Sequence, residues 1–254
     1  MKTIFLSLAF IILSGFPAAL NAQQARFDQA TYLLQQNEYQ EAIQLYKSIA
    51  EDGFESGSLW LNLGISYTYL DSLGTAKFYL LQAEQFPETK TQAQNALAYV
   101  NERFTRQSAV LPQLPWDRFF ESLSRNAGTS FLYVLSFIFL YTGAGAIIFS
   151  WFRKKFEPFL RTTGIGSIVI SILFFGCTFY LQYLDNRYGT GVLVDQETSV
   201  YEQPREDSPV VSSAYEGYTL RVDLYDSQDE PGWNYVRLEN GMYGWIKEDF
   251  VQVF

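Results

Sequence analysis

The sequence predicts a multidomain membrane protein that consists of an all-α solenoid of helical repeats, a two-helix transmembrane hairpin and a small all-β barrel, in this order. Three observations lead to this fold class. A spacing of 34 residues recurs in the N-terminal third, as in stacked helix pairs. Two uncharged runs of 22 residues in the middle match the thickness of a bilayer core, and short β-branched and aromatic segments alternate with turns at the C-terminal end.

The negative charge of the chain is concentrated at its C-terminal end. Residues 192–254 contain 13 acidic and 4 basic residues, and therefore carry the whole formal net charge of −9. Such a surface repels nucleic acid and anionic lipid head groups, and neither is expected as its partner. The simplest role of this charge is to keep an exposed region soluble.

The chain has no histidine and a single cysteine, Cys177, inside the second uncharged run. These absences exclude Ser-His-Asp and Cys-His nucleophiles, histidine metal ligands and an internal disulfide framework. We therefore expect no catalytic, metal-binding or cofactor-binding residues, and we expect the protein not to be an enzyme. A hydrolase that uses carboxylates such as Asp226 and Glu230 is a minor alternative, because both lie in a turn-rich acidic stretch.

Residues 1–22 have the features of an export signal, in which Lys2 precedes an apolar stretch and small residues end at Ala22. Cleavage after Ala22 would leave Gln23 at the mature N-terminus. An uncleaved anchor is the alternative, although about a dozen apolar residues are short for a membrane span. Export of the N-terminus would place residues 23–106 outside the cytoplasm.

Residues 23–106 carry the 34-residue spacing. One unit contains small or apolar residues at five positions, and each recurs as a small or apolar residue 34 positions later: Ala30, Leu33, Ala42, Tyr46 and Ile49 become Gly64, Tyr67, Ala76, Leu80 and Ala83. This pattern is typical of helix-turn-helix repeats that stack into a solenoid. The second unit, Trp60-x-x-Leu63-Gly64-x-x-Tyr67 followed by Ala76, Ala83 and Pro87, resembles the tetratricopeptide repeat. Residues 91–106 are expected to form the closing helix of the stack.

Tetratricopeptide solenoids generally bind a peptide or a partner helix in the concave groove formed by the first helix of each unit. The resemblance implies a mostly apolar groove in this chain, lined by Phe27, Thr31, Leu34, Leu61, Ile65, Thr68 and Tyr69. None of these residues is a lysine, so the groove is not expected to hold a C-terminal carboxylate. For each residue the alternative is that it packs one repeat on the next.

Residues 107–130 are predicted to form a linker rich in proline and tryptophan. Pro112 and Pro115 end the solenoid, because proline lacks an amide donor and restricts the residue before it. Apolar residues then recur at helical spacing, which predicts an amphipathic helix at the membrane surface: Trp116, Phe119, Phe120 and Leu123. A docking site for a partner helix is the alternative.

The two uncharged runs, residues 131–152 and 163–184, are predicted to be transmembrane helices joined by a short basic loop, residues 153–162. An excess of basic residues marks this loop as cytoplasmic and both flanking regions as extracytoplasmic: Arg153, Lys154, Lys155 and Arg161. Small residues at 143–146 and 164–167 offer close helix contacts, within the hairpin or with another protein. A signalling receptor would have to act through another protein's helices, because this loop is too small for an output domain.

Residues 185–254 are predicted to form short strands at 191–195, 199–201, 218–224, 233–238, 242–246 and 251–254. A region of this size closes only a small barrel. The order of a Gly-Trp strand, a tight turn and the tetrad Tyr243-Gly244-Trp245-Ile246 resembles the bacterial SH3-like domain. Some aromatic residues of this region are expected in its core. The candidates for a ligand-binding surface are Tyr201, Tyr215, Trp233 and Tyr243.

The order of these modules resembles the BatE-type proteins of the Bacteroides aerotolerance operon, in which a signal peptide, tetratricopeptide repeats, a transmembrane hairpin and an SH3-like barrel follow one another. The resemblance implies a scaffold in the inner membrane of Bacteroidota, with both terminal regions in the periplasm. It implies partners among membrane-anchored von Willebrand factor A proteins and a MoxR-type ATPase, and a role in stress or oxygen tolerance. The alternative is a cell-wall tether whose SH3-like domain binds peptidoglycan or its peptides.

Overall fold

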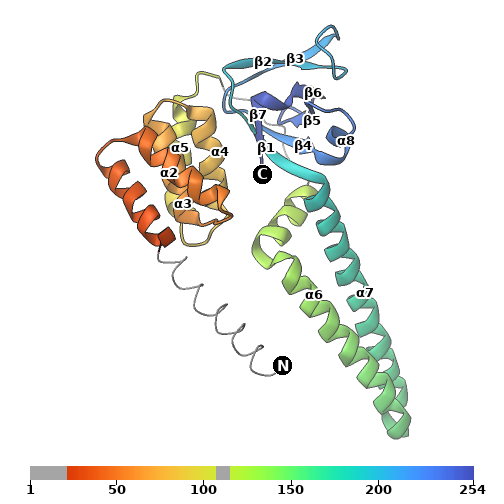
Figure 1. Cartoon of the computed structure of the whole chain (residues 1–254). Helices are drawn as coiled ribbons and strands as arrows, with labels where there is room; N and C mark the ends of the chain where they lie inside the picture. The colour runs from red at the N-terminus through yellow and green to blue at the C-terminus, as the bar shows by residue number, and fades with distance from the viewer. Residues whose placement is uncertain (1–21, 107–114) are drawn as a thin grey trace, which may run out of the picture. The chain divides into compact units, whose positions relative to one another are not determined.

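The computed structural model describes residues 22–106 and 115–254, without the side chains of residues 115–127. The predicted export signal, the first part of the linker and the apolar side chains of the predicted interfacial helix lie outside these described residues. The chain divides into two compact units (Figure 1). One contains the helical region (residues 22–106) and most of the β region (residues 188–254); the other contains the hairpin (residues 115–187) and residues 223–225.

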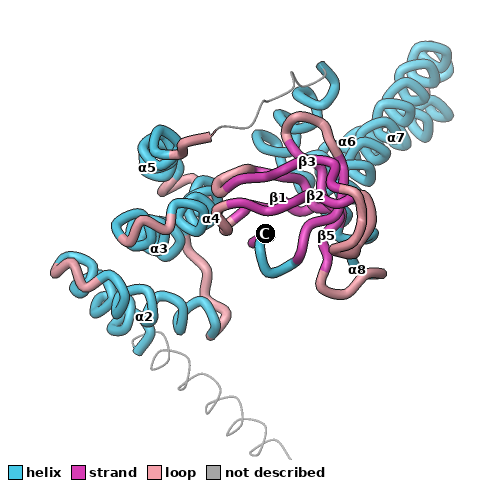
Figure 2. The backbone as a smooth tube through the Cα atoms, turned by 90° about the horizontal axis from the view of Figure 1, so that it is seen from above, coloured by secondary structure: helices cyan, strands magenta, loops and turns pink. Residues whose placement is uncertain are grey.

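The helical region consists of helix pairs that pack like repeats. A first helix at residues 22–35 is followed by α2 (Tyr39–Glu51), α3 (Gly57–Tyr69), α4 (Leu73–Glu84) and α5 (Lys90–Arg103). In Figure 2, α3 lies between α2 and α5. The turns inside the first two pairs are built alike, since Asn37 and Asp71 both adopt the left-handed conformation, with φ values of 64° and 60°. These residues are 34 positions apart, so the repeat found in the sequence is present in the backbone.

Small residues allow the helices of this stack to approach closely. Ala42 and Ala76, which the repeat relates, are fully buried. A Cβ atom added at Gly64 would lie 2.6 Å from side-chain atoms of Leu80, so glycine is required where α3 crosses α4. The large side chains of Leu63 and Leu80 are fully buried between these crossings. Burial of apolar area between pairs stabilises the stack, because each pair alone would leave one face in water.

The β region forms one antiparallel sheet, whose described strands follow the order β3-β2-β6-β5-β4-β1-β7. The strands are β1 (Tyr188–Leu193), β2 (Glu197–Tyr201), β3 (Val210–Tyr215), β4 (Thr219–Asp223), β5 (Trp233–Leu238), β6 (Tyr243–Lys247) and β7 (Val251–Val253). Two short helices, α8 (Leu224–Gln228) and η2 (Glu248–Phe250), lie between strands. Alternate residues of each strand point inward, so that Val200, Val236 and Ile246 are fully buried.

Two features of the β region differ from the sequence prediction. Strand β3 was not predicted, because Ser212 and Ser213 interrupt its apolar pattern; it forms by pairing with β2, in which Ser199 lies opposite Ser213. The strand predicted at 218–224 ends at Asp223, and Leu224 begins α8 instead. The other predicted strands are present within a few residues of their expected ends.

The hairpin consists of α6 (Pro115–Phe152), the short helix η1 (Lys154–Phe156) and α7 (Glu157–Arg187). Gly128 interrupts α6 with non-helical angles of φ 70° and ψ 154°. The segments Gly128–Phe152 and Lys154–Arg187 are long and apolar enough to cross a membrane, and they contain the two predicted spans. The connection is shorter than the predicted loop, because α7 begins at Glu157 with Pro158 in its first turn, where the missing amide proton is not needed.

Polar and small residues join α6 to α7. Ser136 and Ser171 are both buried, and each donates its hydroxyl to the other's backbone carbonyl, at 3.2 and 2.8 Å. A Cβ atom at Gly143 would lie 2.8 Å from the carbonyl oxygen of Gly164, and one at Gly164 would lie 2.9 Å from that of Gly143. This confirms close contact at residues 143 and 164 within the hairpin, as expected for helices in lipid.

Within the first unit, the turn between β3 and β4 contacts the start of α4. The Glu216 carboxylate accepts a hydrogen bond from the backbone amide of Gly74 (2.7 Å), and the ammonium group of Lys77 donates to the carbonyl of Gly217 (2.6 Å). Further along α4, Phe78 packs edge to face on Phe254, with ring centroids 5.5 Å apart. The helical region and the β region are therefore joined by polar and apolar contacts.

Gly74 provides a test of this contact. A Cβ atom there would lie 2.7 Å from the carbonyl oxygen of Leu193 and 2.9 Å from the Cα atom of Val194. We expect Gly74→Leu to separate α4 from β1, at a cost of about 1–3 kcal/mol. Hydrogen exchange measured by mass spectrometry should show faster exchange in β1 and at Gly217. The control Gln44→Leu, at an exposed position of α2, should leave both segments unchanged, and equal protection in the two variants would contradict the assignment.

Candidate functional site

Most groove candidates of the helical region take part in its packing. Leu34 and Leu61 are half-buried against the core of the stack, and Ile65 is half-buried as well. Phe27 meets Tyr46 edge to face, with 5.5 Å between the ring centroids. Thr68 donates its hydroxyl proton to the carbonyl of Gly64 (2.7 Å). Packing against the core of the stack accounts for the positions of Phe27, Leu34 and Leu61.

A buried tyrosine fixes the relative positions of the first three helices. The Tyr46 hydroxyl on α2 lies 2.9 Å from the Thr31 hydroxyl and accepts a hydrogen bond from the Asn62 amide on α3 (2.8 Å). Burial raises the pKa of the Tyr46 hydroxyl above its ordinary value, and these two hydrogen bonds oppose that shift. Thr31, a groove candidate, is therefore a positioning residue whose hydroxyl is directed at Tyr46.

Two tyrosines, one on α3 and one on α5, remain exposed. Tyr69 on α3 is 65% exposed and stacks on Tyr39, with 4.7 Å between centroids and 6° between the planes. Tyr99 on α5 is 55% exposed, and the guanidinium of Arg103 lies 5.6 Å from its ring centroid. Tyr99 follows the groove candidate Ile65 by 34 positions, so the repeat period indicates Tyr99 as a further groove candidate. It was missed because residues 91–106 were interpreted only as a closing helix. We call Tyr69 and Tyr99 the groove tyrosines.

Three of the four aromatic candidates in the β region meet on one face of the sheet. Tyr201 and Trp233 lie edge to face, with ring centroids 5.6 Å apart. Tyr243 stacks on Tyr235 at 6.3 Å, and Tyr235 contacts Trp245 at 5.0 Å. We call these five residues of β2, β5 and β6 the aromatic face: Tyr201, Trp233, Tyr235, Tyr243 and Trp245.

The strand register explains why these rings converge. Tyr235 lies directly opposite Trp245, and Trp245 lies opposite Tyr201. Their neighbours in the chain, such as Val236 and Ile246, point to the other side and form the core. The sequence prediction did not include Tyr235 and Trp245 as site residues. Each lies two positions after a candidate, Trp233 or Tyr243, and residues two apart in a strand share one face of the sheet.

Charged side chains border the aromatic face. The Arg237 guanidinium lies 5.3 Å from the ring centroid of Tyr243. Lys247 forms an ion pair with Glu206, which raises the pKa of the lysine and lowers that of the carboxyl group. A broad amphipathic surface with polar edges is typical of sites that bind a peptide or another protein.

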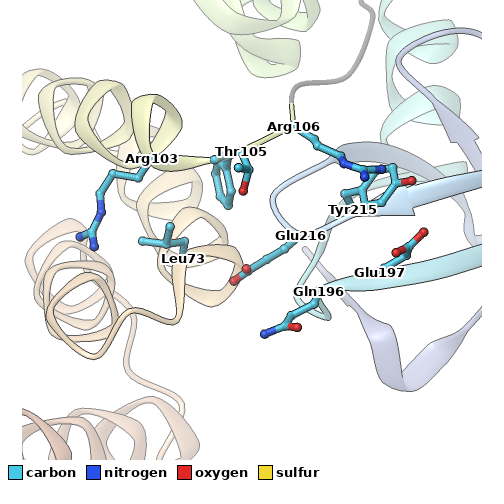
Figure 3. Close-up of a pocket in the computed structure, with 9 residues that line it drawn as sticks. Leu73, Arg103, Thr105, Arg106, Gln196, Glu197, Tyr215 and Glu216 are labelled. Carbon is cyan, nitrogen blue, oxygen red and sulfur yellow. The ribbon is translucent and has the colours of Figure 1, made fainter.

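The fourth candidate, Tyr215, lies apart from this face in a cleft of about 450 Å³. The cleft is lined by Leu73, Arg103, Phe104, Thr105, Arg106, Gln196, Glu197, Tyr215 and Glu216. Figure 3 shows Arg106 against the ring of Tyr215, with 4.2 Å between the guanidinium carbon and the ring centroid, while Arg103 points away from it. Arg103 pairs with Asp71 at 2.8 Å. Tyr215 is thus a contact between the helical region and the β region.

A half-buried lysine, Lys77, lies at the same junction. The Lys77 ammonium group, hydrogen-bonded to Gly217, lies 5.7 Å from the ring centroid of Phe104. Burial lowers the pKa of Lys77 below its ordinary value, and the nearby charge of Glu239 acts in the opposite direction. This cation is therefore held by one carbonyl and one ring in surroundings that disfavour its charge.

The carboxylates considered for a hydrolase occupy separate positions. Asp226 lies in α8, and Glu230 follows that helix, where its backbone carbonyl accepts a hydrogen bond from the amide of Trp233 (3.1 Å). Across residues 22–106 and 128–254, whose side chains the structure describes, His, Cys, Asp and Glu side chains form no group of three that would hold a metal ion. The aromatic face and the groove tyrosines are aromatic surfaces, whereas the cleft at Tyr215 is lined mostly by polar and charged side chains.

No known protein-family model matches this chain, and no curated protein matches it at a significant level. Among the surfaces described above, the aromatic face brings five rings together, and the groove tyrosines lie in the same compact unit of the chain.

The lowered pKa of the half-buried Lys77 predicts a pH dependence of stability. Because its pKa is lowered by folding, the folded state binds this proton less readily than the unfolded state, and stability rises with pH between the folded pKa and the ordinary value of 10.5. Thermal unfolding of the detergent-solubilised chain between about pH 8 and pH 10 should show that the wild type gains stability relative to Lys77→Met. Lys90→Met, at an exposed position, should follow the wild type. A constant difference between wild type and Lys77→Met would contradict the lowered pKa.

Proposed function

We propose that this chain is a membrane-anchored scaffold that presents two protein-recognition surfaces outside the cytoplasm. In this proposal the helical region is a tetratricopeptide solenoid, the β region is an SH3-like barrel, and the hairpin crosses the inner membrane with its basic tip in the cytoplasm. The observation that carries the proposal is the aromatic face, on which five rings from three strands converge. Aromatic residues of this kind dominate the binding energy of many protein interfaces.

The presence of a second surface in the same compact unit supports a scaffold rather than a single receptor site. The groove tyrosines belong to α3 and α5, which share a unit with β2, β5 and β6. When a partner is bound at one surface, a second contact at the other becomes intramolecular, which raises its effective concentration. Two weak contacts then hold a partner, or two partners, for longer than either contact alone.

The order of the modules gives the proposal its partners. Resemblance to BatE-type proteins implies a complex with membrane-anchored von Willebrand factor A proteins and a MoxR-type ATPase, linked to stress or oxygen tolerance. The periplasmic surfaces would contact the von Willebrand factor A proteins. The two membrane helices would keep both surfaces close to partners that are themselves anchored in the membrane.

Crosslinking and affinity purification from native membranes test this proposal. Tyr69→Asp with Tyr99→Asp, and separately Tyr235→Ala with Tyr243→Ala, should each reduce recovery of the von Willebrand factor A proteins about tenfold, because each pair removes exposed aromatic contacts. The control is Tyr32→Asp, since Tyr32 is 61% exposed, close to the 65% of Tyr69, and lies outside the predicted groove. If both double variants recover the von Willebrand factor A proteins at the wild-type level, the proposal is wrong.

A cell-wall tether is the second candidate, and the aromatic face favours it as well. Flat, half-exposed rings such as Trp233 and Trp245 are able to stack on sugar rings, and the polar edge around Arg237 is able to bind the peptides of peptidoglycan.

Sedimentation of the full chain with purified sacculi separates the two candidates. If the aromatic face binds peptidoglycan, Tyr243→Ala and Trp245→Ala should each lower the bound fraction about tenfold, whereas Tyr69→Asp should not change it. Tyr243 is half exposed, so its removal leaves the core intact. The absence of binding by the wild-type chain would exclude the tether.

A further inference from the structure

The tip of the hairpin, residues 149–161, has a charge opposite to that of the β region. Between residues 131 and 184 the charged side chains are confined to this tip, where four are basic and one is acidic. The strongly acidic residues 192–254 lie at the other end of α7 in the sequence. The tip is therefore a separate cationic site, which the scaffold proposal does not use.

One of the four cations is neutralised within the tip. Arg161 pairs with Glu157 one helical turn earlier, at 3.2 Å. Of the remaining three, Arg153 lies 6.0 Å from the ring centroid of Phe149 and Lys155 lies 6.0 Å from that of Phe156. No carboxylate of the described residues forms an ion pair with Arg153, Lys154 or Lys155, and all three side chains are exposed.

Large aromatic side chains surround these cations and are exposed. The exposed fractions are 64% for Trp151, 77% for Phe152, 54% for Phe156 and 68% for Phe159. Aromatic side chains next to lysine and arginine are typical of the level of the lipid head groups, where rings lie between acyl chains and water. An exposed apolar patch of this kind marks a membrane or protein contact, and the adjacent lysine and arginine side chains favour lipid head groups.

The length of the spanning helix places the tip at that level. Gly128–Phe152 contains 25 residues, which at about 1.5 Å per residue reach about 37 Å, more than the hydrocarbon core of about 30 Å. The residues that follow Phe152 therefore leave the core and meet the phosphate groups.

We propose that Arg153, Lys154 and Lys155 form a binding site for the phosphate groups of anionic phospholipids. The exposed aromatic side chains that surround these three residues hold the site at the level of the head groups. The planar guanidinium of Arg153 matches two phosphate oxygens, and the lysine ammonium groups add mobile point charges. An anionic lipid is favoured over a zwitterionic one, because the latter carries its own ammonium group next to the phosphate. The site is independent of which proteins bind the opposite ends of the chain.

Lipid retention by the purified full chain tests this site. The chain in detergent is equilibrated with equal amounts of phosphatidylglycerol and phosphatidylcholine, and the retained lipids are identified by native mass spectrometry. The wild type should retain phosphatidylglycerol over phosphatidylcholine by roughly tenfold or more, and salt should reduce the ratio. The triple variant Arg153→Gln, Lys154→Gln, Lys155→Gln should retain the two lipids about equally.

Two control variants keep the result interpretable. The triple variant Arg153→Lys, Lys154→Arg, Lys155→Arg preserves the charge and should keep the preference for phosphatidylglycerol. Neutralisation of three exposed cations outside the hairpin, Lys90→Gln, Arg205→Gln and Arg221→Gln, should also keep it. Equal retention of both lipids by the wild type would overturn the proposal, and so would a wild-type ratio in the neutral tip variant or a loss of preference in the second control.

Discussion

The contact between the β3–β4 turn and the start of α4 is the interaction on which the arrangement of the recognition surfaces depends. The side chain of Ser72 does not cap α4; the Glu216 carboxylate accepts the amide proton of Gly74 instead, at the positive end of the helix dipole. Gly217 follows with a φ of 79°, and a Cβ atom there would collide with the ring of Phe104. Gly74 lets the backbone of α4 approach that of β1, and Gly217 leaves room for the ring of Phe104. The helical region and most of the β region belong to one compact unit.

A different constraint applies to the hairpin in the proposed bilayer, where apolar burial would provide no driving force between helices. Small residues such as Gly143 and Gly164 let the backbones touch, and the hydroxyl groups of Ser136 and Ser171 find carbonyl partners that lipid cannot provide. The larger side chains, such as Phe137 and Phe179, point outward and are exposed, as lipid-facing residues are. Apolar side chains thus form the core of the helical and β regions, whereas in the hairpin they form much of the surface.

Much of the fold was predictable because the sequence pattern is local. The 34-residue period located the helix pairs, and even the left-handed turn residues Asn37 and Asp71 obey it. Strand β3 was not predictable, since it owes its conformation to pairing with β2 rather than to its own residues. The length of the loop at 153–162 was overestimated, because a proline in the first turn of a helix has the same local sequence pattern as a proline in a loop.

The candidate site was predictable only in part, for a related reason. Alternation along β5 and β6 decides which rings face outward, and Tyr201, Trp233 and Tyr243 share that face. Tyr215 has the same residue type but lies on the unpredicted strand, where it stacks with Arg106. In the helical region, the positions that line a groove also pack neighbouring pairs, so residue type alone did not separate Phe27 from the exposed Tyr69.

The break at Gly128 has a consequence for the proposed membrane span. Without it, α6 would run unbroken through 38 residues, or about 57 Å, far longer than any bilayer core. With it, 25 residues remain to cross, and their excess over a core of about 30 Å is removed by a moderate tilt. A single glycine thus sets the hydrophobic mismatch of the first arm, and with it the range of bilayer thickness that the anchor accepts.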